Sequence, residues 1–232
     1  MSDRGWSEQL VEPFYEVVQK GERMAFPSGQ VCWAPAIYPY EQPLYLELQN
    51  YDPRNESAHF SLRIRPPTDD APKHTPIKAL SLEANESLLV VKAKKRPVVV
   101  LGSVEVVWLD NPQKLIVCVP LFTFKARHSD EAVLRIQAFQ IPNHFYLPPD
   151  PRHRRQESVA RLELTQPIGK GWLQPFHGGE GPVRLTMPAR TLLTHQFMKF
   201  CAHPDLDRRL EEEIGAYREL LLESYGLTPT ES

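Results

Sequence analysis

Alternation of apolar and polar residues with a period of two is the clearest pattern along this chain, and it is typical of β-strands. One such run covers 44–49 and another covers 59–65, with the polar segment 50–57 between them. Six apolar side chains carry the alternation: Leu44, Leu46, Leu48, Phe60, Leu62 and Ile64. The pattern predicts a hairpin over 44–65 whose apolar side chains share one face.

Further strands are predicted along the middle of the chain. The apolar run 97–101 is typical of a strand that is buried on both faces. The segments 104–109 and 115–120 predict a second hairpin, because the turn-forming residues 110–113 separate them. The remaining strands are predicted at 29–33, 132–138 and 160–165.

Helical patterns are confined to the two ends of the chain. The segment 7–20 predicts an N-terminal helix that is interrupted near Pro13. Near the other end, Pro188 suits the first turn of a helix that stops at Pro204, and a second helix runs from about 205 to Gly226. We therefore expect a C-terminal helical part over about 188–226.

Composition favours a mainly β fold of the α+β class. The 232 residues include 23 prolines and 11 glycines, and this proline content is about twice the usual ~5%. Proline interrupts long helices and suits rigid turns. Hydrophobic residues make up 41% and charged residues 24%, an ordinary globular mixture that excludes a wholly disordered, collagen-like or coiled-coil chain. We predict a single domain over 1–232.

Three features lead us to expect a cytoplasmic protein. No apolar run approaches the ~18 residues of a membrane-spanning helix. The first residues lead into Glu8, Gln9 and Glu12 and not into the apolar segment of a secretory signal. The cysteines Cys32, Cys118 and Cys201 are odd in number and far apart, as expected of reduced thiols.

Basic residues gather at the ends of three predicted strands, although the net charge is −2. The clusters comprise Lys92, Lys94, Lys95 and Arg96; Lys125, Arg127 and His128; and Arg152, Arg154 and Arg155. Phe122, Phe124, Phe145 and Tyr146 lie between them and could stack on bases. Taken singly, each cluster is a solvated strand end; taken together, the three favour a phosphate-binding surface at one end of a barrel.

Motifs for other chemistries are absent from the sequence. The eight histidines include no pair four residues apart, and there is no C-x-x-C spacing, so we expect no bound metal and no cofactor. There is no G-x-S-x-G elbow, and the glycine-rich segment 178–181 lacks the lysine of a phosphate-binding loop. An acyl-transfer or nucleotide-hydrolysing enzyme is therefore disfavoured.

Four short segments resemble, in order, the strands of the PemK/MazF family of toxin endoribonucleases. Residues 29–33 (GQVCW) resemble the family's opening G-x-[VI]-x-W strand, and residues 96–102 (RPVVVLG) resemble its R-P-V-V-V-L-S strand. Residues 116–123 (IVCVPLFT) are similar to its third strand, which ends in threonine. Residues 157–163 (ESVARLE) are similar to its late D-S-V-A-L-x-[DE] strand.

The resemblance implies a fold and an activity. The fold would be an SH3-like antiparallel barrel over about 29–168 with a β-hairpin inserted within 43–92, one N-terminal helix and two C-terminal helices. The activity would be metal-independent, sequence-selective cleavage of single-stranded RNA. The resemblance also implies a homodimer and a toxin that is restrained by a small antitoxin protein.

The resemblance also assigns residues to roles. Arg96 and Thr123 match the catalytic arginine and threonine, and Glu41, in a pair that resembles the family's S-E-Q loop, is a candidate for proton transfer or RNA contact. A guanidinium stays charged and donates two hydrogen bonds to phosphate oxygens, which suits a developing negative charge. Nearby cations would bind the RNA backbone: Lys94, Lys95, Lys125 and Arg127.

A second hypothesis remains open at this point. About fifty residues stand where the family has a short first loop, and the late strand continues as Leu164-Thr165-Gln166-Pro167 where the family has Q-I-R-T. These departures favour a non-catalytic RNA- or protein-binding module on the same fold, with the insertion covering the old cleft. The presence of both Arg96 and Thr123 favours the enzyme.

Overall fold

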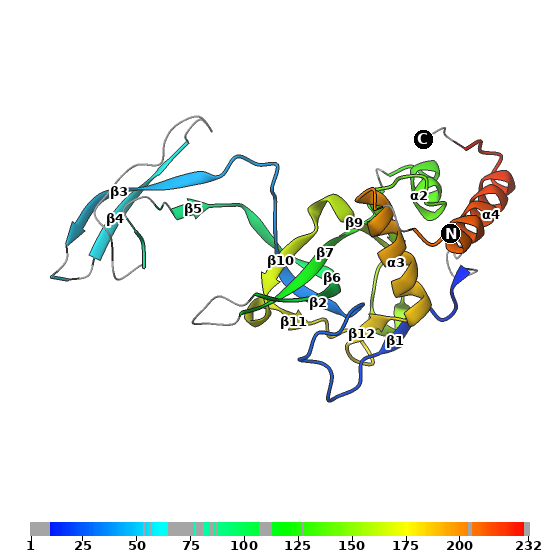
Figure 1. Ribbon diagram of the computed structural model, residues 1–232, viewed down its shortest axis with the longest axis horizontal. Helices are drawn as coiled ribbons and strands as arrows, with labels where there is room; N and C mark the ends of the chain where they lie inside the picture. The colour runs from blue at the N-terminus through cyan, green and yellow to red at the C-terminus, as the bar shows by residue number, and fades with distance from the viewer. Residues whose placement is uncertain are drawn as a thin grey trace. The chain divides into compact units, whose positions relative to one another are not determined.

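The computed structural model describes residues 10–52, 54–55, 57–64, 77, 81–83, 86, 88–106, 113–126, 128–203 and 206–229. The chain divides into two compact units (Figure 1). The larger unit comprises Met1–Ala36 and Lys95–Ser232, and the smaller unit comprises Ile37–Lys94. The smaller unit encloses the segment 43–92 that the sequence marks as an insertion.

The larger unit is built on antiparallel strands. Its strands are β1 (Tyr15–Val17), β2 (Val31–Ile37), β6 (Ala93–Val106), β7 (Gln113–Thr123), β8 (His144–Leu147), β9 (Ser158–Arg161), β10 (Gln166–Gly169), β11 (Gln174–Pro175) and β12 (Val183–Leu185). Seven of them form one sheet in the order β11-β2-β6-β7-β9-β8, with β10 paired to β7. The pairings among the described residues leave this sheet open, and β1 pairs separately with β12.

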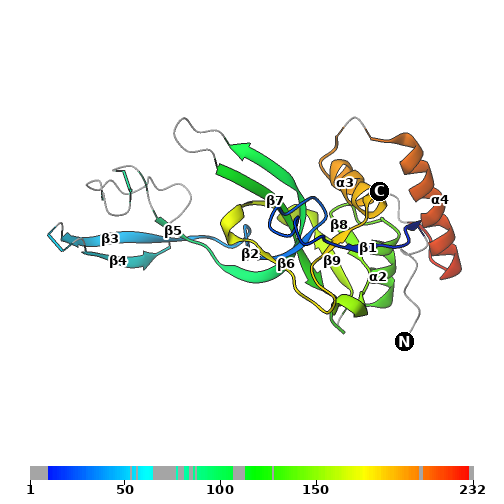
Figure 2. The same cartoon turned by 90° about the horizontal axis from the view of Figure 1, so that it is seen from below.

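The described residues of the larger unit also contain the α-helices α2 to α4 and three short 3₁₀ turns. The helices are α2 (Asp130–Gln137), α3 (Met187–Phe200) and α4 (Arg208–Ser224), and the turns are η2 (Pro151–His153), η3 (Leu162–Leu164) and η4 (Lys170–Trp172). Figures 1 and 2 show the three helices gathered near β9. The two predicted C-terminal helices are confirmed as α3 and α4, and the fold is mainly β with α-helices, as composition predicts. No helix among the described residues is both long and apolar enough to cross a membrane.

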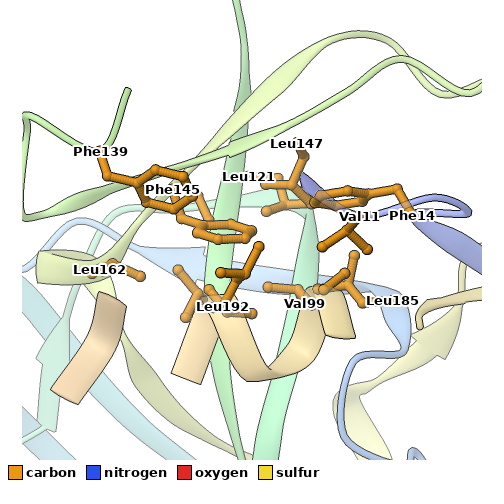
Figure 3. Close-up of a cluster of buried hydrophobic side chains, with 14 of the residues drawn as sticks. Val11, Phe14, Val99, Leu121, Phe139, Phe145, Leu147, Leu162, Leu185 and Leu192 are labelled. Carbon is orange, nitrogen blue, oxygen red and sulfur yellow. The ribbon is translucent and has the colours of Figure 1, made fainter. Parts of the chain in front are cut away.

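Strand β6 is the centre of the larger unit. Val98, Val99 and Val100 are fully buried, and they alternate between two hydrophobic clusters on the two faces of the sheet. Val99 belongs to the cluster that α3 and α4 cover, where Figure 3 shows Phe139, Phe145 and Leu192 converging. The prediction of a strand buried on both faces is therefore confirmed.

The buried cysteines lie in the other cluster. Cys32 of β2 and Cys118 of β7 are fully buried with Val98 and Val100, whereas Cys201, after α3, is exposed. Burial raises the pKa of the Cys118 thiol to about 12 and raises the pKa of the Cys32 thiol further. All three are free thiols.

The helix predicted for 7–20 is wrong over Tyr15–Val17. This segment is strand β1, which pairs with Val183–Leu185 of β12. Pro13 precedes it, and the buried side chains of Phe14 and Tyr15 pack into the core, so sheet pairing satisfies the backbone where proline breaks a helix. Residues 1–9 lie outside the described residues.

The strand predicted for 132–138 is also wrong, because this segment lies mostly in helix α2. The Ser129 hydroxyl accepts a hydrogen bond from the Ala132 amide, and Asp130 and Glu131 occupy the first turn. These are the features of a helix N-terminus. Val133 and Ile136 then lie three residues apart on one helix face and pack against Tyr146 and Val159.

The hairpin predicted over 104–120 is confirmed, and the strand predicted over 160–165 is shorter than expected. Strands β6 and β7 pair as far as Val106 opposite Gln113, and the turn 107–112 lies outside the described residues. The segment predicted as a strand over 160–165 leaves β9 at Arg161 and turns into η3, although Ala160, Leu162 and Leu164 are buried as the pattern predicts.

The smaller unit contains the hairpin predicted for 44–65. Strands β3 (Leu44–Asp52) and β4 (Ser57–Arg63) pair with Leu46 opposite Leu62 and Leu48 opposite Phe60, so the predicted apolar face is confirmed. Strand β5 (Leu88–Val90) adds to the other side of β3. The hairpin forms its own three-stranded sheet and adds no strand to the seven-stranded one. Leu62 and Ile64 are 58% and 72% exposed, so they do not enter a core.

A glycine turn holds the loop that follows β8. A Cβ atom on Gly178 would clash with the carbonyl oxygen of His153, and one on Gly179 would clash with that of Arg152. The backbone of this turn therefore packs directly on η2, which leads into Arg154 and Arg155. Only residues without a side chain allow this approach.

We predict that Gly178→Ala lowers the free energy of unfolding by roughly 1–3 kcal/mol, because the added methyl group must displace backbone atoms. Urea or thermal unfolding measures the change. Gly171→Ala is the matched control, since a Cβ there meets nothing within 4 Å, and its stability should stay within about 0.5 kcal/mol. Equal stability of the two variants would show that the turn is not packed as described.

Candidate functional site

One pocket of the larger unit brings strand ends and a basic loop together. Its volume is about 330 Å³. Pro97 of β6, Leu121 and Thr123 of β7 and Ser158 of β9 line it together with the loop residues Arg154, Arg155 and Gln156, and the aromatic residues Trp33 and Phe176 complete it. We call it the Arg155 pocket. Its basic lining comes from the third of the predicted basic clusters.

Strand pairing and a closed loop place these side chains. Thr123, the last residue of β7, lies opposite Ser158, the first residue of β9. The loop before β9 is closed by two backbone hydrogen bonds between Asp150 and Arg155, of 2.8 and 3.1 Å. Arg154 takes the left-handed conformation between η2 and this closure, with φ of 51°. Arg154 and Arg155 are therefore fixed by the backbone next to the Thr123–Ser158 pair.

A buried hydrogen bond between side chains anchors the same loop. The carboxylate of Asp150 lies 2.6 Å from Nδ1 of His153, and both side chains are almost completely buried. Arg152 approaches the other oxygen of this carboxylate at 3.8 Å. The carboxylate of Asp150 therefore interacts with His153 and Arg152 of its own turn and forms no ion pair with Arg155.

Arg155 is a buried cation that contacts aromatic rings. Its side chain is 7% exposed, and Cζ lies 4.8 Å from the ring centre of Tyr15 and 6.0 Å from that of Phe176. Nε and Nη1 are buried and have no hydrogen-bond partner among the described residues. Cation–π contacts offset part of the cost of burying the charge, but they leave these N–H groups unsatisfied.

Hydroxyl groups lie beside this cation. Ser158 is 5% exposed, and its Oγ has no hydrogen-bond partner among the described residues. Thr123 is exposed and lines the same pocket. A guanidinium with hydroxyl donors around it matches the oxygen atoms of a phosphate or carboxylate. The Arg155 pocket is therefore suited to bind an oxyanion.

One wall of the pocket is aromatic. The rings of Trp33 and Phe176 stack with centres 5.2 Å apart and an angle of 27° between their planes. Nζ of Lys95 lies 5.9 Å from the Trp33 ring and donates to Oε1 of Gln174 at 2.8 Å. Lys95, one of the predicted RNA-binding residues, is thereby held next to this wall.

Arg96 lies on the other face of the sheet. Its Cζ is 4.3 Å from the ring centre of Phe122, and Cζ of Arg161 is 5.3 Å from the same ring. Phe122 and Thr123 are consecutive in β7, so their side chains point to opposite faces. The structure therefore groups Thr123 with Arg155 and separates it from Arg96.

The other predicted site residues are not among those that line the Arg155 pocket. Glu41 belongs to the smaller unit, where its carboxylate lies 2.7 Å from Nζ of Lys92, and Lys94 is an exposed residue of that unit. Lys125 is exposed after β7, and Arg127 lies outside the described residues. The sequence offers Phe145 and Tyr146 as base-stacking residues, but both are buried. Phe145 lies in the cluster that contains Val99, and Tyr146 lies in the small cluster between α2 and β9.

The sequence gives no role to Ser158 or Phe176, and it marks Arg155 only as one member of a basic cluster. The run of arginines at 152–155 marks the loop, but no pattern in the sequence tells which arginine is buried. Within the described ranges, no three histidine, cysteine, aspartate or glutamate side chains lie close enough together to hold a metal ion.

Comparisons with known proteins identify no relative. No protein-family model matches the chain, and neither a curated protein nor a solved structure matches it. The resemblance of the four strand segments to a toxin family therefore stays a hypothesis.

On the face that carries Arg96, His144 lies opposite Arg161 in the β8–β9 pair. Burial lowers the pKa of His144, and Arg161 acts in the same direction while Glu163 opposes it. The neutral imidazole is thus favoured by folding. Its contribution to stability is present above the unfolded pKa of about 6.5 and is lost as the pH falls through that value toward the folded pKa.

We predict that the melting temperature of the wild type falls between pH 7.5 and pH 5.5, and that His144→Gln makes this fall smaller. Parallel thermal unfolding of both proteins across this range measures the difference, which removes the contribution of the other histidines. An unchanged pH dependence in the variant would contradict the assignment to His144.

Proposed function

We propose that this protein is an endoribonuclease that binds single-stranded RNA at the Arg155 pocket and cleaves it without a metal ion. The observation that carries the proposal is the grouping of Thr123, which matches the catalytic threonine of the toxin family, with a buried guanidinium and a second hydroxyl. A strand-end threonine alone carries no chemistry. With a cation beside it, the hydroxyl can orient the oxygens of a phosphodiester.

The proposed reaction uses the nucleophile that RNA itself carries. The 2′-oxygen attacks phosphorus and loses its proton, the bond from phosphorus to the 5′-oxygen breaks, and the departing 5′-oxygen takes up a proton. The products are a 2′,3′-cyclic phosphate and a 5′-hydroxyl. Arg155 would stabilise the additional negative charge on the phosphate oxygens, and Thr123 would hold the phosphodiester in line.

Single-stranded RNA suits this pocket for two reasons. A 2′-hydroxyl next to phosphorus distinguishes RNA from DNA, and unpaired bases can leave the stack to contact aromatic side chains. The edge of the Trp33–Phe176 pair lines the pocket, and Lys95 is held beside it, so a base and a neighbouring phosphate could be bound together.

We propose further that the seven-stranded core corresponds to the SH3-like barrel of the PemK/MazF type. The Arg-Pro-Val-Val-Val strand β6 pairs with the threonine-ending strand β7, and β7 pairs with the Ser-Val-Ala strand β9. On this proposal the protein is a cytoplasmic homodimer and a toxin that a small antitoxin protein inhibits.

A specific observation favours a second candidate, a non-catalytic RNA-binding module. The described residues that line the pocket include no carboxylate and no imidazole that could accept a proton from the 2′-hydroxyl. Such a module would use the same cation and hydroxyls to hold a phosphodiester without breaking it.

We expect purified protein to cut mixed single-stranded RNA in the presence of EDTA and to leave 2′,3′-cyclic phosphate ends. An RNA with one 2′-deoxy sugar at the cut position should bind normally and resist cleavage, because it lacks the nucleophile. Gel electrophoresis and end-group analysis measure both. Loss of activity on chelation, or equal cleavage of the deoxy substrate, would refute the mechanism; binding without cleavage by the folded protein would leave the second candidate.

We predict that Thr123→Val lowers the cleavage rate by about 10²-fold, on the scale of one positioned hydrogen-bond donor, while the fold is kept. Thr194→Val on the exposed side of α3 is the matched control and should cleave like the wild type. Single-turnover rates measure both variants. Full activity of Thr123→Val would remove this residue from the reaction.

A further inference from the structure

We propose that Arg155, and not Arg96, is the receptor for a phosphate group in this protein, with the Ser158 hydroxyl as its second donor. The proposal rests on the proposed function for the identity of the substrate as RNA. The binding of a phosphate group follows from the geometry of the pocket and is tested separately below.

Burying the charge of Arg155 has an energetic cost. Arg155 is only 7% exposed, so its guanidinium loses most of its hydration, and the charge is stable there only when other groups replace that hydration. The rings of Tyr15 and Phe176 do so for the faces of the group. Its edges include two buried N–H groups without an acceptor among the described residues, and a bound oxyanion would satisfy them.

The charge around the pocket also bears on the ligand. Arg154 contributes another cation to the lining, and no ion pair joins Arg155 to any described carboxylate. The acidic residues nearest in sequence are engaged elsewhere: Asp150 is bound to His153, and Glu157 accepts a hydrogen bond from the hydroxyl of Tyr146 at 2.6 Å. The pocket therefore favours an anion over a cationic or neutral ligand.

The hydrogen-bond donors beside Arg155 in the pocket lining include the hydroxyl groups of Ser158 and Thr123. The Oγ of Ser158 is buried without a partner among the described residues, and Thr123 lies opposite Ser158 in the β7–β9 pair and lines the same pocket. Hydroxyl groups around a planar guanidinium can surround the several oxygens of a tetrahedral phosphate, whereas a planar carboxylate offers two. A phosphate group is thus the oxyanion that uses the whole set.

The separation of Arg96 from Thr123 completes the argument. Arg96 packs against Phe122 on the opposite face, beside Arg161, which itself pairs with Glu163. Arg96 therefore has a packing role in the sheet, and Arg155 holds the place next to the hydroxyls that the family resemblance gives to an arginine.

The test measures phosphate binding to the full-length chain and three variants. Inorganic phosphate is titrated at constant ionic strength against thermal unfolding, with chloride as the reference anion. Arg155→Met keeps an apolar side chain against Tyr15 and Phe176 and removes the charge. Arg152→Met is the matched control on the same loop, because Arg152 is exposed and does not line the pocket. Ser158→Ala removes the second donor with little change in volume.

We expect a saturable rise in the melting temperature of the wild type and of Arg152→Met, of roughly 5–10 °C at 100 times the dissociation constant. Arg155→Met should show no such rise, while its melting temperature in phosphate-free buffer stays close to that of the wild type. Ser158→Ala should bind phosphate roughly tenfold more weakly. If Arg155→Met does not fold, the weakened binding of Ser158→Ala still tests the site.

A second arm identifies the source of the phosphate. Single-stranded 2′-O-methyl RNA, which has no free nucleophile, is measured with a 5′-phosphate and with a 5′-hydroxyl. A loss of affinity in Arg155→Met for both oligonucleotides assigns Arg155 to an internal phosphodiester, and a loss for the phosphorylated one alone assigns it to a terminal phosphate. Either result supports the receptor.

Two results would overturn the proposal: the same phosphate-dependent rise in Arg155→Met as in the wild type, or no saturable response of the wild type to phosphate and to either RNA. The proposed function fails differently. RNA that is bound through Arg155 and never cut by the wild type would remove the endoribonuclease and leave the phosphate receptor in place.

Discussion

The burial of strand β6 on both faces is the constraint on which the larger unit depends. Because Val98, Val99 and Val100 have no exposed face, every backbone N–H and C=O group around them needs a partner from a neighbouring strand. On one side Val100 accepts from Gly29 and donates to Gln30, and on the other β7 pairs along its length. The two hydrophobic clusters then follow, since each face of the sheet must be covered: one by α3 and α4, and the other by side chains that include Phe26, Ile168 and Leu173.

The same alternation decides what the ends of these strands can do. Arg96 and Pro97 are neighbours in sequence, as are Phe122 and Thr123, but in each pair the pleat sends the two side chains to opposite faces. One face receives an arginine packed on an aromatic ring, and the other receives a hydroxyl next to a pocket. The loop 151–155, fastened by Asp150 and by the glycine turn, then brings a different arginine to that hydroxyl. The chemistry of the site is therefore set by strand register and loop closure together.

The sequence predicts those elements whose pattern directly reflects burial. The run 97–101, the leucines of β3 and the apolar stripes of α3 and α4 all show their structure because one period accounts for each. Helix α2 was missed because Ala132, Leu134, Ile136 and Ala138 alternate by chance, and its Ser129 cap is the stronger signal. At the site, the strand-end Thr123 is predictable. The burial of Arg155 is not, since it depends on Tyr15 and Phe176, which lie far from it in sequence and reach it only through the tertiary fold.

The distribution of thiols gives the molecule a built-in reporter of its own opening. Cys201 is exposed, so alkylating reagents can reach it in the native state. These reagents react with thiolates, and Cys32 and Cys118 are buried and hold their protons. In the sheet, β6 lies between β2, which carries Cys32, and β7, which carries Cys118. The rate at which these two cysteines become labelled, set against the immediate labelling of Cys201, therefore measures how often the centre of the sheet comes apart.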